Sequence, residues 1–265
     1  QIISLKKMKN NYIANIDKQI KSAMLLASIF GSLLLPSVAN AFPVYAQQAY
    51  ENPREATGRI VCANCHLAQK PTEIEVPQGV LPDTVFEAVV DIPYDLSVKQ
   101  VTGDGTKGPL NVGAVMILPE GFKLAPKERL NDELKKATEG VVISPYSDSK
   151  QNILVVGPIS GNEHQKIVFP ILAPNPAENR DVHFIKYPIF VGANRGRGQV
   201  QPTGEKSNNT IYTSPVEGQI VKVESTDKLT TFTINSKSGD AITVKVPVGP
   251  DIIVKEGDSL KADQP

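Results

Sequence analysis

Residues Val85-Phe-Glu-Ala-Val-Val-Asp-Ile92 form the first of several strand-like segments from which the fold class is predicted. This segment is rich in β-branched and aromatic residues, and Pro93 follows it directly, which is typical of a β-strand. Similar segments recur along the chain between turns rich in proline and glycine, at residues 113–118, 152–156, 166–169 and 182–187. Strands of this kind at this spacing favour a mostly β protein built on an antiparallel β-sandwich.

Helical signals are few. Residues 126–140 carry leucines four apart and end at a glycine, which predicts one short surface helix. Asn52 followed by Pro53 resembles an N-cap with proline at the first helical position, so a second helix is expected to begin there. The 21 prolines and 19 glycines agree with many turns between short strands.

A second β unit is predicted near the end of the chain. The polar, glycine-rich stretch at 192–209 resembles a boundary between domains. Short strand-like segments follow it at residues 218–223, 230–234, 241–246 and 251–254, with a last turn at 255–258. The sequence therefore predicts a large domain over residues 42–209 and a small β domain over residues 210–265.

The first 41 residues have the pattern of a cleaved signal peptide. A lysine-rich start leads into an apolar run at 23–35, and Ala39 and Ala41 supply the small residues of a cleavage site. The alternative, a membrane anchor, is disfavoured because the apolar run at 23–35 is shorter than the about 20 residues that a bilayer span needs. Cleavage after Ala41 would leave Phe42 with a free α-amino group.

The charge balance limits the possible partners. The whole chain holds 28 basic and 28 acidic side chains. Because residues 1–41 contain five lysines and one aspartate, acidic residues outnumber basic ones in the remainder. This balance argues against a nucleic-acid-binding protein, so any cationic surface for a partner must be a local patch.

Cys62-Ala-Asn-Cys65-His66 is the motif that points to chemistry. C-x-x-C-H is the attachment signature of c-type haem. Residues three and four apart share one face of a helical turn, so both thiols can add to the vinyl groups of one porphyrin. His66 returns to the same face, where its imidazole can bind the iron. The motif predicts one covalently bound c-type haem.

Three other roles for these cysteines have less support. A redox dithiol is expected in a βαβ context, which the strand pattern lacks. A zinc site needs a fourth strong ligand, for which His164 and His183 are the remaining histidines. A disulfide across so short a loop would restrict little chain entropy.

The sixth iron ligand stays open from spacing alone. Met116 lies in an apolar strand-like segment, where a core role is expected, and His164 lies in a polar turn. His183 alternates with apolar neighbours, as a structural histidine does. None of the three stands out as the second axial ligand.

Several long stretches of the chain resemble cytochrome f, the haem subunit of the cytochrome b6f complex of oxygenic photosynthesis. The matching stretches are residues 41–48, 50–68, 110–114, 119–122, 187–188, 194–199 and 206–209. The resemblance implies an elongated β-sandwich that carries the haem, and a small β domain inserted late in it. It also implies that the sixth ligand is the α-amino nitrogen of the mature first residue, which is Phe42 here. The pKa of an α-amine, near 8, allows it to lose its proton and bind iron.

The family's role implies outer-sphere electron transfer rather than enzyme catalysis. The expected donor is the Rieske iron–sulfur protein, and the expected acceptor is plastocyanin or a small soluble c-type cytochrome. A membrane helix is expected beyond Pro265, with the haem domain in the thylakoid lumen of a chloroplast or cyanobacterium. The alternative is a haem enzyme or gas sensor with an open sixth coordination site.

The resemblance also implies a partner surface. Lys99, Lys107 and Lys228 match a basic ridge that steers acidic partners, whereas Thr106 replaces another lysine of that ridge. A ridge with fewer charges gives weaker steering and a shallower salt dependence. Ordinary solvated lysines are the alternative interpretation.

A buried water chain is the last implied feature. In the family it is lined by asparagine and glutamine, and Gln100, Asn194, Gln199 and Asn209 match here. Alternatively, these four amides satisfy the backbone of turns.

Overall fold

The computed structural model describes residues 43–183, 186 and 188–265. The predicted signal peptide and Phe42 lie outside the described residues. Most of the described chain forms antiparallel β-sheets, with few short helices, as the strand pattern predicts. Among these residues, no helix combines the length and hydropathy that a bilayer span requires.

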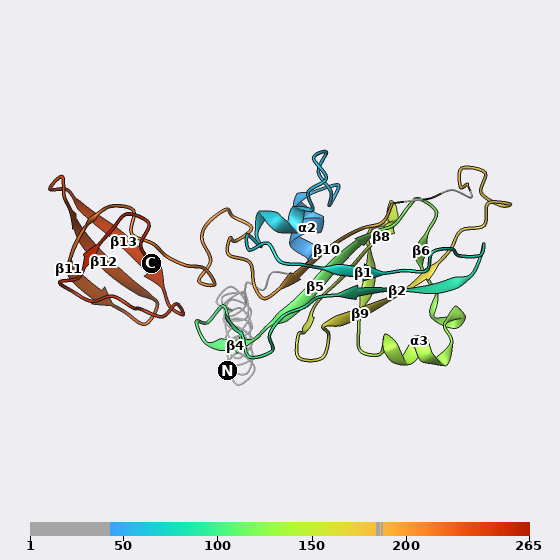
Figure 1. Ribbon diagram of the computed structural model, residues 1–265, viewed down its shortest axis with the longest axis horizontal. Coiled ribbons are helices and arrows are strands. Elements are labelled where there is room, and N and C mark those ends of the chain that lie inside the picture. Colours follow the sequence, from blue (N-terminus) through green and yellow to red (C-terminus); the bar gives the residue numbers. More distant parts are fainter. Residues whose placement is uncertain (1–42, 184–185, 187) are drawn as a thin grey trace, which may run out of the picture. The chain divides into compact units, whose positions relative to one another are not determined.

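Two four-stranded sheets form the larger part of the fold (Figure 1). The first contains, in spatial order, β1 (Glu73–Glu75), β2 (Val85–Asp91), β9 (Lys166–Leu172) and β6 (Lys123–Leu124). The second contains β10 (Phe190–Arg195), β5 (Asn111–Ile117), β8 (Lys150–Ser160) and β7 (Ile143–Ser147). Each pair of neighbours runs antiparallel, so consecutive side chains point to opposite faces.

The inner faces of these two sheets share one hydrophobic core. Alternate residues of each strand supply it, for example Ala88 and Val90 in β2, and Ile167 and Phe169 in β9. Val112, Ala114 and Met116 of β5 and Leu154 and Val156 of β8 complete the core from the second sheet. This packing confirms the predicted antiparallel β-sandwich.

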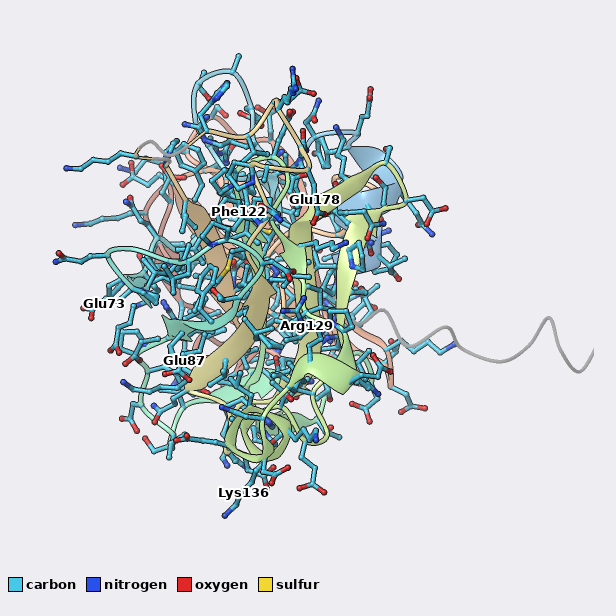
Figure 2. The ribbon with its side chains drawn as sticks, turned by 90° about the vertical axis from the view of Figure 1, so that its right-hand side faces the viewer. Glu73, Glu87, Phe122, Arg129, Lys136 and Glu178 are labelled. Carbon is cyan, nitrogen blue, oxygen red and sulfur yellow. The ribbon has the colours of Figure 1, made fainter. Side chains whose placement is uncertain are left out.

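The outer faces of the sandwich differ. On the first sheet, Glu73 and Glu87 project into solvent, as does Lys136 of the neighbouring helix (Figure 2). On the second sheet, Val115, Val155 and Tyr146 are buried on the outer side as well. After Asn111, the central strand β5 is consequently apolar throughout, as expected where both faces of a sheet are covered.

The cover on that outer face comes from the N-terminal part of the chain. Ala46 of α2 (Pro43–Ala49), together with Ile60 and Cys62, packs against Val115 and its buried neighbours. Figure 1 shows α2 beside β8 and β10, and α2 contacts β8. The C-x-x-C-H motif therefore lies against the outer face of the second sheet.

The helix predicted at 126–140 is present in two short pieces. They are η2 (Lys127–Arg129) and α3 (Asp132–Ala137). Asn131 caps α3, because its Oδ1 accepts a hydrogen bond from the Leu134 backbone N–H at 2.8 Å. The helix predicted to begin at Asn52 is wrong. Arg54 instead pairs with Ile60 in an isolated β-bridge, which uses the backbone groups that a helix would need.

A third sheet follows Asn209 in the chain. Its spatial order is β13 (Ala241–Pro247), β12 (Leu229–Ser236), β11 (Gly218–Ser225) and β14 (Ser259–Leu260). Its own core contains Ile220, Phe232, Ile234, Val246 and Leu260. A separate two-stranded sheet joins β3 (Lys99–Val101) to β4 (Lys107–Pro109). The predicted domain boundary after residue 209 stays a prediction.

Two strand predictions are wrong. Residues 251–254 form no strand, and β14 rather than this segment pairs with β11 at the edge of the sheet. Val182, His183 and Lys186, the described residues of the strand predicted at 182–187, lie outside any strand. The polar, glycine-rich stretch at 192–209 begins inside β10, where Gly192 pairs with Val115 of β5.

Candidate haem site

The C-x-x-C-H motif begins in a 3-10 turn, η1 (Val61–Asn64), immediately after the Arg54–Ile60 bridge. Val61 is buried, and its N–H donates to the Pro53 carbonyl at 2.8 Å. The Cys62 carbonyl accepts hydrogen bonds from the backbone N–H groups of Cys65 at 3.2 Å and His66 at 2.9 Å. Side chains three apart align in a 3-10 turn, so the two cysteines share one side of it.

Both cysteines are free thiols and are partly buried. Burial raises the pKa of Cys62 to about 11, and it also raises the pKa of Cys65. Thiols with raised pKa values are protonated at neutral pH, whereas reactive dithiols depend on a lowered pKa. The site therefore differs in its electrostatics from a thioredoxin-like redox centre.

His66 is held in its neutral form. Burial lowers its pKa to about 4, because a desolvated imidazolium is destabilised. A neutral imidazole keeps a lone pair on one ring nitrogen and can bind a metal without first losing a proton.

A cavity of about 430 Å³ opens beside Cys62 and His66. Residues from 191 to 195 in β10 form one wall, and residues 68–70 and Thr72 form part of the rim. Its volume falls in the usual range for cofactor sites, ~300–1,000 Å³. Two free thiols on one turn, a neutral imidazole and an adjacent cavity fit a covalently attached haem.

Two glycines allow close packing around the motif. A Cβ on Gly192 would lie 2.7 Å from Ile60 Cγ2, so glycine lets β10 approach the segment before the motif. A Cβ on Gly198 would lie 3.1 Å from the Cys65 carbonyl oxygen. In addition, the Arg54 guanidinium lies 3.8 Å from the centre of the Phe190 ring, a cation–π contact that joins the same two segments.

Gln199 holds the end of the motif. Its backbone N–H donates to the Cys65 carbonyl at 2.8 Å, and its Oε1 accepts from the Leu67 N–H at 2.9 Å. Gln199 and Asn194 both line the cavity. The structure thus brings two of the four water-chain candidates to the haem site.

The other two water-chain candidates lie near Arg197 and Val101. Asn209 accepts from the Val101 N–H at 2.9 Å and donates to the Arg197 carbonyl at 2.8 Å. Gln100 is 4% exposed, and its Nε2 donates to the Pro109 carbonyl at 2.8 Å. Its Oε1 is buried without a hydrogen-bond partner in the described part of the chain.

The remaining ligand candidates are not among the lining residues of the cavity. Met116 is fully buried in the sandwich core, as predicted. His164 Nδ1 lies 2.8 Å from the Ser160 carbonyl oxygen, and His183 is exposed. Among residues 43–183, 186 and 188–265, no three His, Cys, Asp or Glu side chains cluster closely enough to hold a metal ion. Phe42, the sixth ligand implied by the resemblance, lies outside the described residues.

Tyr146 is a site residue that the sequence reasoning missed. Its hydroxyl lies 2.7 Å from the Ala46 carbonyl oxygen and 2.6 Å from that of Tyr50, and Gln47 Nε2 donates to the Tyr146 carbonyl at 2.7 Å. Burial raises the pKa of Tyr146 to about 12, so the hydroxyl remains a donor. The available signal was an aromatic residue in a strand-like segment, which does not reveal the partner.

The three lysines of the predicted ridge are all exposed. Lys99 and Lys107 lie on the paired strands β3 and β4. Lys107 forms an ion pair with Asp251, which partly neutralises it. Lys228 precedes β12, and its carbonyl accepts from the Val248 N–H at 3.1 Å.

The fold and the site together define a class: a β-sandwich protein with a c-type haem attachment motif on the outer face of one sheet. Comparison with known sequences identifies the family. Residues 42–196 match the family model described as "Apocytochrome F, N-terminal", and residues 208–265 match "Apocytochrome F, C-terminal". The chain belongs to the cytochrome f family of photosynthetic electron-transfer haem proteins, which confirms the resemblance in its sequence.

Individual relatives agree with this assignment. The chain is 73% identical to cytochrome f of Rhodomonas salina over 258 residues, which cover 97% of this chain and 81% of that protein. It is 75% identical to cytochrome f of Guillardia theta over 226 residues, 85% of this chain and 70% of that one. The cyanobacterial cytochrome f of Synechococcus elongatus is 57% identical over 244 residues, 91% of this chain and 78% of that protein.

Proposed function

We propose that this chain binds one c-type haem covalently through Cys62 and Cys65 and carries single electrons within a cytochrome b6f complex. The observation that carries this proposal is the 3-10 turn of the C-x-x-C-H motif, set beside a cavity on the outer face of the second sheet. When bound, the haem iron supplies reversible one-electron chemistry between its ferric and ferrous states.

The protein's own residues have distinct tasks. The thiols of Cys62 and Cys65 would form the two thioether bonds to the haem, and burial keeps both thiols protonated until they react. His66 would supply a neutral imidazole to the iron. The hydrogen bonds from Gln199 and Val200 to the Cys65 carbonyl keep the turn rigid, so little rearrangement accompanies a change of charge.

The sixth ligand is proposed to be the α-amino nitrogen of Phe42. Supporting this, α2 begins at Pro43, the next residue, and Ala46 of this helix packs in the same apolar cluster as Cys62. The hydroxyl of Tyr146 binds the Ala46 and Tyr50 carbonyls and so holds α2 against the sheet. Removal of residues 1–41 as a signal peptide is required, because only cleavage creates the free amine.

The physiological partners follow from the family. The electron donor is proposed to be the Rieske iron–sulfur protein, and the acceptor plastocyanin or a soluble c-type cytochrome. Lys99, Lys107 and Lys228 would attract an acidic acceptor, although the Asp251 carboxylate and the threonine at 106 weaken the ridge. The location would be the thylakoid membrane, with the haem domain in the lumen and an anchor helix beyond Pro265.

A water chain through the protein is proposed along Gln100, Asn194, Gln199 and Asn209. Its support is the buried Oε1 of Gln100, which has no described protein partner, because buried amides of this kind usually bind an ordered water. Asn194 and Gln199 line the haem cavity and would be its other end.

Three measurements on the purified protein test the proposal. A pyridine haemochrome spectrum should report c-type haem, and N-terminal sequencing should begin at Phe42. Carbon monoxide should bind the reduced protein poorly, because both axial positions are filled. Ready carbon monoxide binding would support the alternative, a haem enzyme or gas sensor with an open sixth site.

A processing variant tests the axial ligand separately. Ala39→Leu combined with Ala41→Leu should block cleavage, keep the covalent haem and change the optical spectrum of the axial ligand field. The same spectrum in uncleaved and cleaved protein would rule out Phe42 as the ligand.

A further inference from the structure

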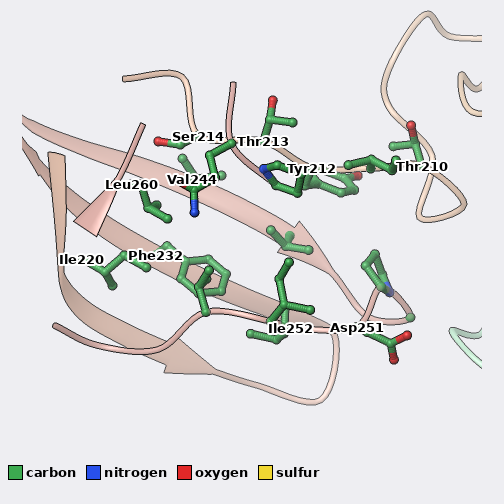
Figure 3. Close-up of a pocket in the computed structure, with 18 of the residues that line it drawn as sticks. Thr210, Tyr212, Thr213, Ser214, Ile220, Phe232, Val244, Asp251, Ile252 and Leu260 are labelled. Atoms are coloured by element: carbon green, nitrogen blue, oxygen red, sulfur yellow. The ribbon is translucent and has the colours of Figure 1, made fainter. Parts of the chain in front are cut away.

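The third sheet carries a pocket that is separate from the haem cavity. Its volume is about 640 Å³, and it is lined by the sheet's core residues and by residues 210–214 and 249–254 (Figure 3). Figure 3 shows Tyr212 and Thr213 along one side, with Asp251 and Ile252 on the opposite side and Phe232 between them. The volume falls within the range of small-molecule sites, ~300–1,000 Å³.

The interior of this pocket is apolar. Phe232, Val244 and Leu260 present the inner face of the sheet to it. At its margin, Ile211 and Ile253 are 70% and 73% exposed, although large aliphatic side chains usually avoid water. The apolar surface therefore continues from the core of the sheet out to solvent, as the tail of an extended apolar ligand requires.

The charged groups of the pocket lie at its rim and are net positive. Lys99, Lys107 and Asp251 are the charged residues among those that line it. Lys107 and Asp251 form an ion pair, whereas Lys99 makes no ion pair with any described residue. The ammonium group of Lys99 is thus available to a negatively charged ligand.

Hydroxyl donors line the same pocket. The side chains of Thr210 and Thr213 line the pocket and make no hydrogen bond to other residues that the structure describes. A carboxylate accepts hydrogen bonds from hydroxyl and ammonium groups alike. The donors and the apolar surface therefore match the two ends of one amphipathic molecule.

We propose that this pocket binds a single-chain fatty carboxylate. The alkyl tail lies over Phe232 and Val244, and the carboxylate meets Lys99 with the threonine hydroxyls. The ammonium group of Lys99, which pairs with no described carboxylate, favours this ligand over an uncharged lipid. The pocket favours a single carboxylate over a polyanion because Asp251 offsets the charge of Lys107.

Decanoate is a suitable probe, with decan-1-ol as its uncharged counterpart, and the protein is the haem-loaded chain from residue 42. Titration calorimetry should show saturable binding of decanoate at a ratio of one to one. Ile252→Trp places a large side chain at the pocket mouth. It should weaken the binding of both probes about tenfold, equivalent to ~1.4 kcal/mol. Because Ile252 is 46% exposed, this change leaves the core of the sheet intact.

A matched pair of lysine variants isolates the charge. Lys99→Gln should weaken the binding of decanoate about two- to fivefold, the usual contribution of one exposed ion pair, and should leave the binding of decan-1-ol unchanged. Lys245→Gln removes the same charge from β13, where Lys245 is exposed between the pocket-lining Val244 and Val246, and should alter neither probe. Equal effects of the two variants would overturn the proposed role of Lys99.

Chemical-shift mapping keeps the proposal testable if a variant fails to fold. In the unmodified protein, decanoate should shift the methyl resonances of Val244, Ile252 and Leu260 and leave Val191 at the haem cavity unchanged. The absence of saturable binding, or shifts centred on Val191, would refute the pocket as the site.

Discussion

The Tyr146 hydroxyl lies 2.7 Å from the carbonyl oxygen of Ala46, and this contact joins strand β7 to the helix that begins beside Phe42. The same hydroxyl lies 2.6 Å from the Tyr50 carbonyl, so one buried group serves both α2 and the residue that follows it. The N-terminal segment is therefore held to the sandwich by polar contacts as well as by the packing of Ala46.

Tyr146→Phe should lower the free energy of unfolding by about 0.5–1.5 kcal/mol, because it removes the hydroxyl donor shared by the Ala46 and Tyr50 carbonyls. Denaturant unfolding measures this loss. The variant should also broaden the spectral signature of the axial ligand, since α2 is less firmly held. Tyr94→Phe is the control: it removes the hydrogen bond from Tyr94 to the Gly161 carbonyl and should reduce stability without touching the haem spectrum.

His66 makes the haem-free protein sensitive to acid. Burial holds the pKa of His66 at about 4 in the folded chain, against an ordinary 6.5, so the unfolded chain binds more protons between these values. The stability that depends on His66 is complete above pH 6.5 and is lost as the pH falls towards 4. Unfolding curves over this window should show a weaker pH dependence in His66→Gln.

His164→Gln provides the comparison for that experiment. His164 interacts with the Ser160 carbonyl and does not line the haem cavity. Its replacement should leave the acid sensitivity of the haem-free protein as it is in the unmodified chain. A loss of sensitivity in both variants would show that His66 is not the responsible group.

Gly192→Ala should loosen the contact between β10 and the haem segment. The new Cβ would lie 2.7 Å from Cγ2 of Ile60, a stiff β-branched side chain, so one of the two segments must move. Overpacking of this kind destabilises by about 1–3 kcal/mol, and haem incorporation should fall with it. Gly79→Ala has open space around it and should preserve both stability and haem content.

Asp251→Asn should strengthen the attraction of an acidic electron acceptor. The change removes the partner of Lys107 and restores one charge to the proposed ridge. Stopped-flow electron transfer at low ionic strength should become a few-fold faster and should converge with the unmodified protein at high salt. Asp148→Asn removes an equal charge from the turn between β7 and β8, away from the ridge lysines in the sequence. If it accelerates the reaction equally, net charge rather than Lys107 governs the rate.

The strand pattern predicted the sandwich well because alternation is a local property. Residues 85–92 and 113–118 were expected as strands, and β2 and β5 occupy them to within two residues at either end. The strand pattern failed to predict segments that form a strand only because a strand distant in the sequence pairs with them. Gly192 carries no strand signal, yet it lies in β10 because β5 supplies the partner backbone.

The same limit explains the apolar segment at 251–254. Its composition is that of a strand, but the edge beside β11 is taken by Ser259–Leu260, and the isoleucines lie along a pocket instead. Apolar composition indicates that a segment packs against other residues, but it does not indicate whether its backbone pairs with a neighbouring strand.

The class of cofactor and the kind of fold could both be predicted from the amino-acid sequence. The spacing of Cys62, Cys65 and His66 acts within one turn, and strand alternation acts within a few residues, so both can be read locally. Only the tertiary structure places the motif on the outer face of the second sheet, against β10 and hydrogen-bonded to Gln199. The same packing brings the Tyr146 hydroxyl to α2. The physical reason is that these contacts join residues distant in the chain, and only the packed sheets bring them together.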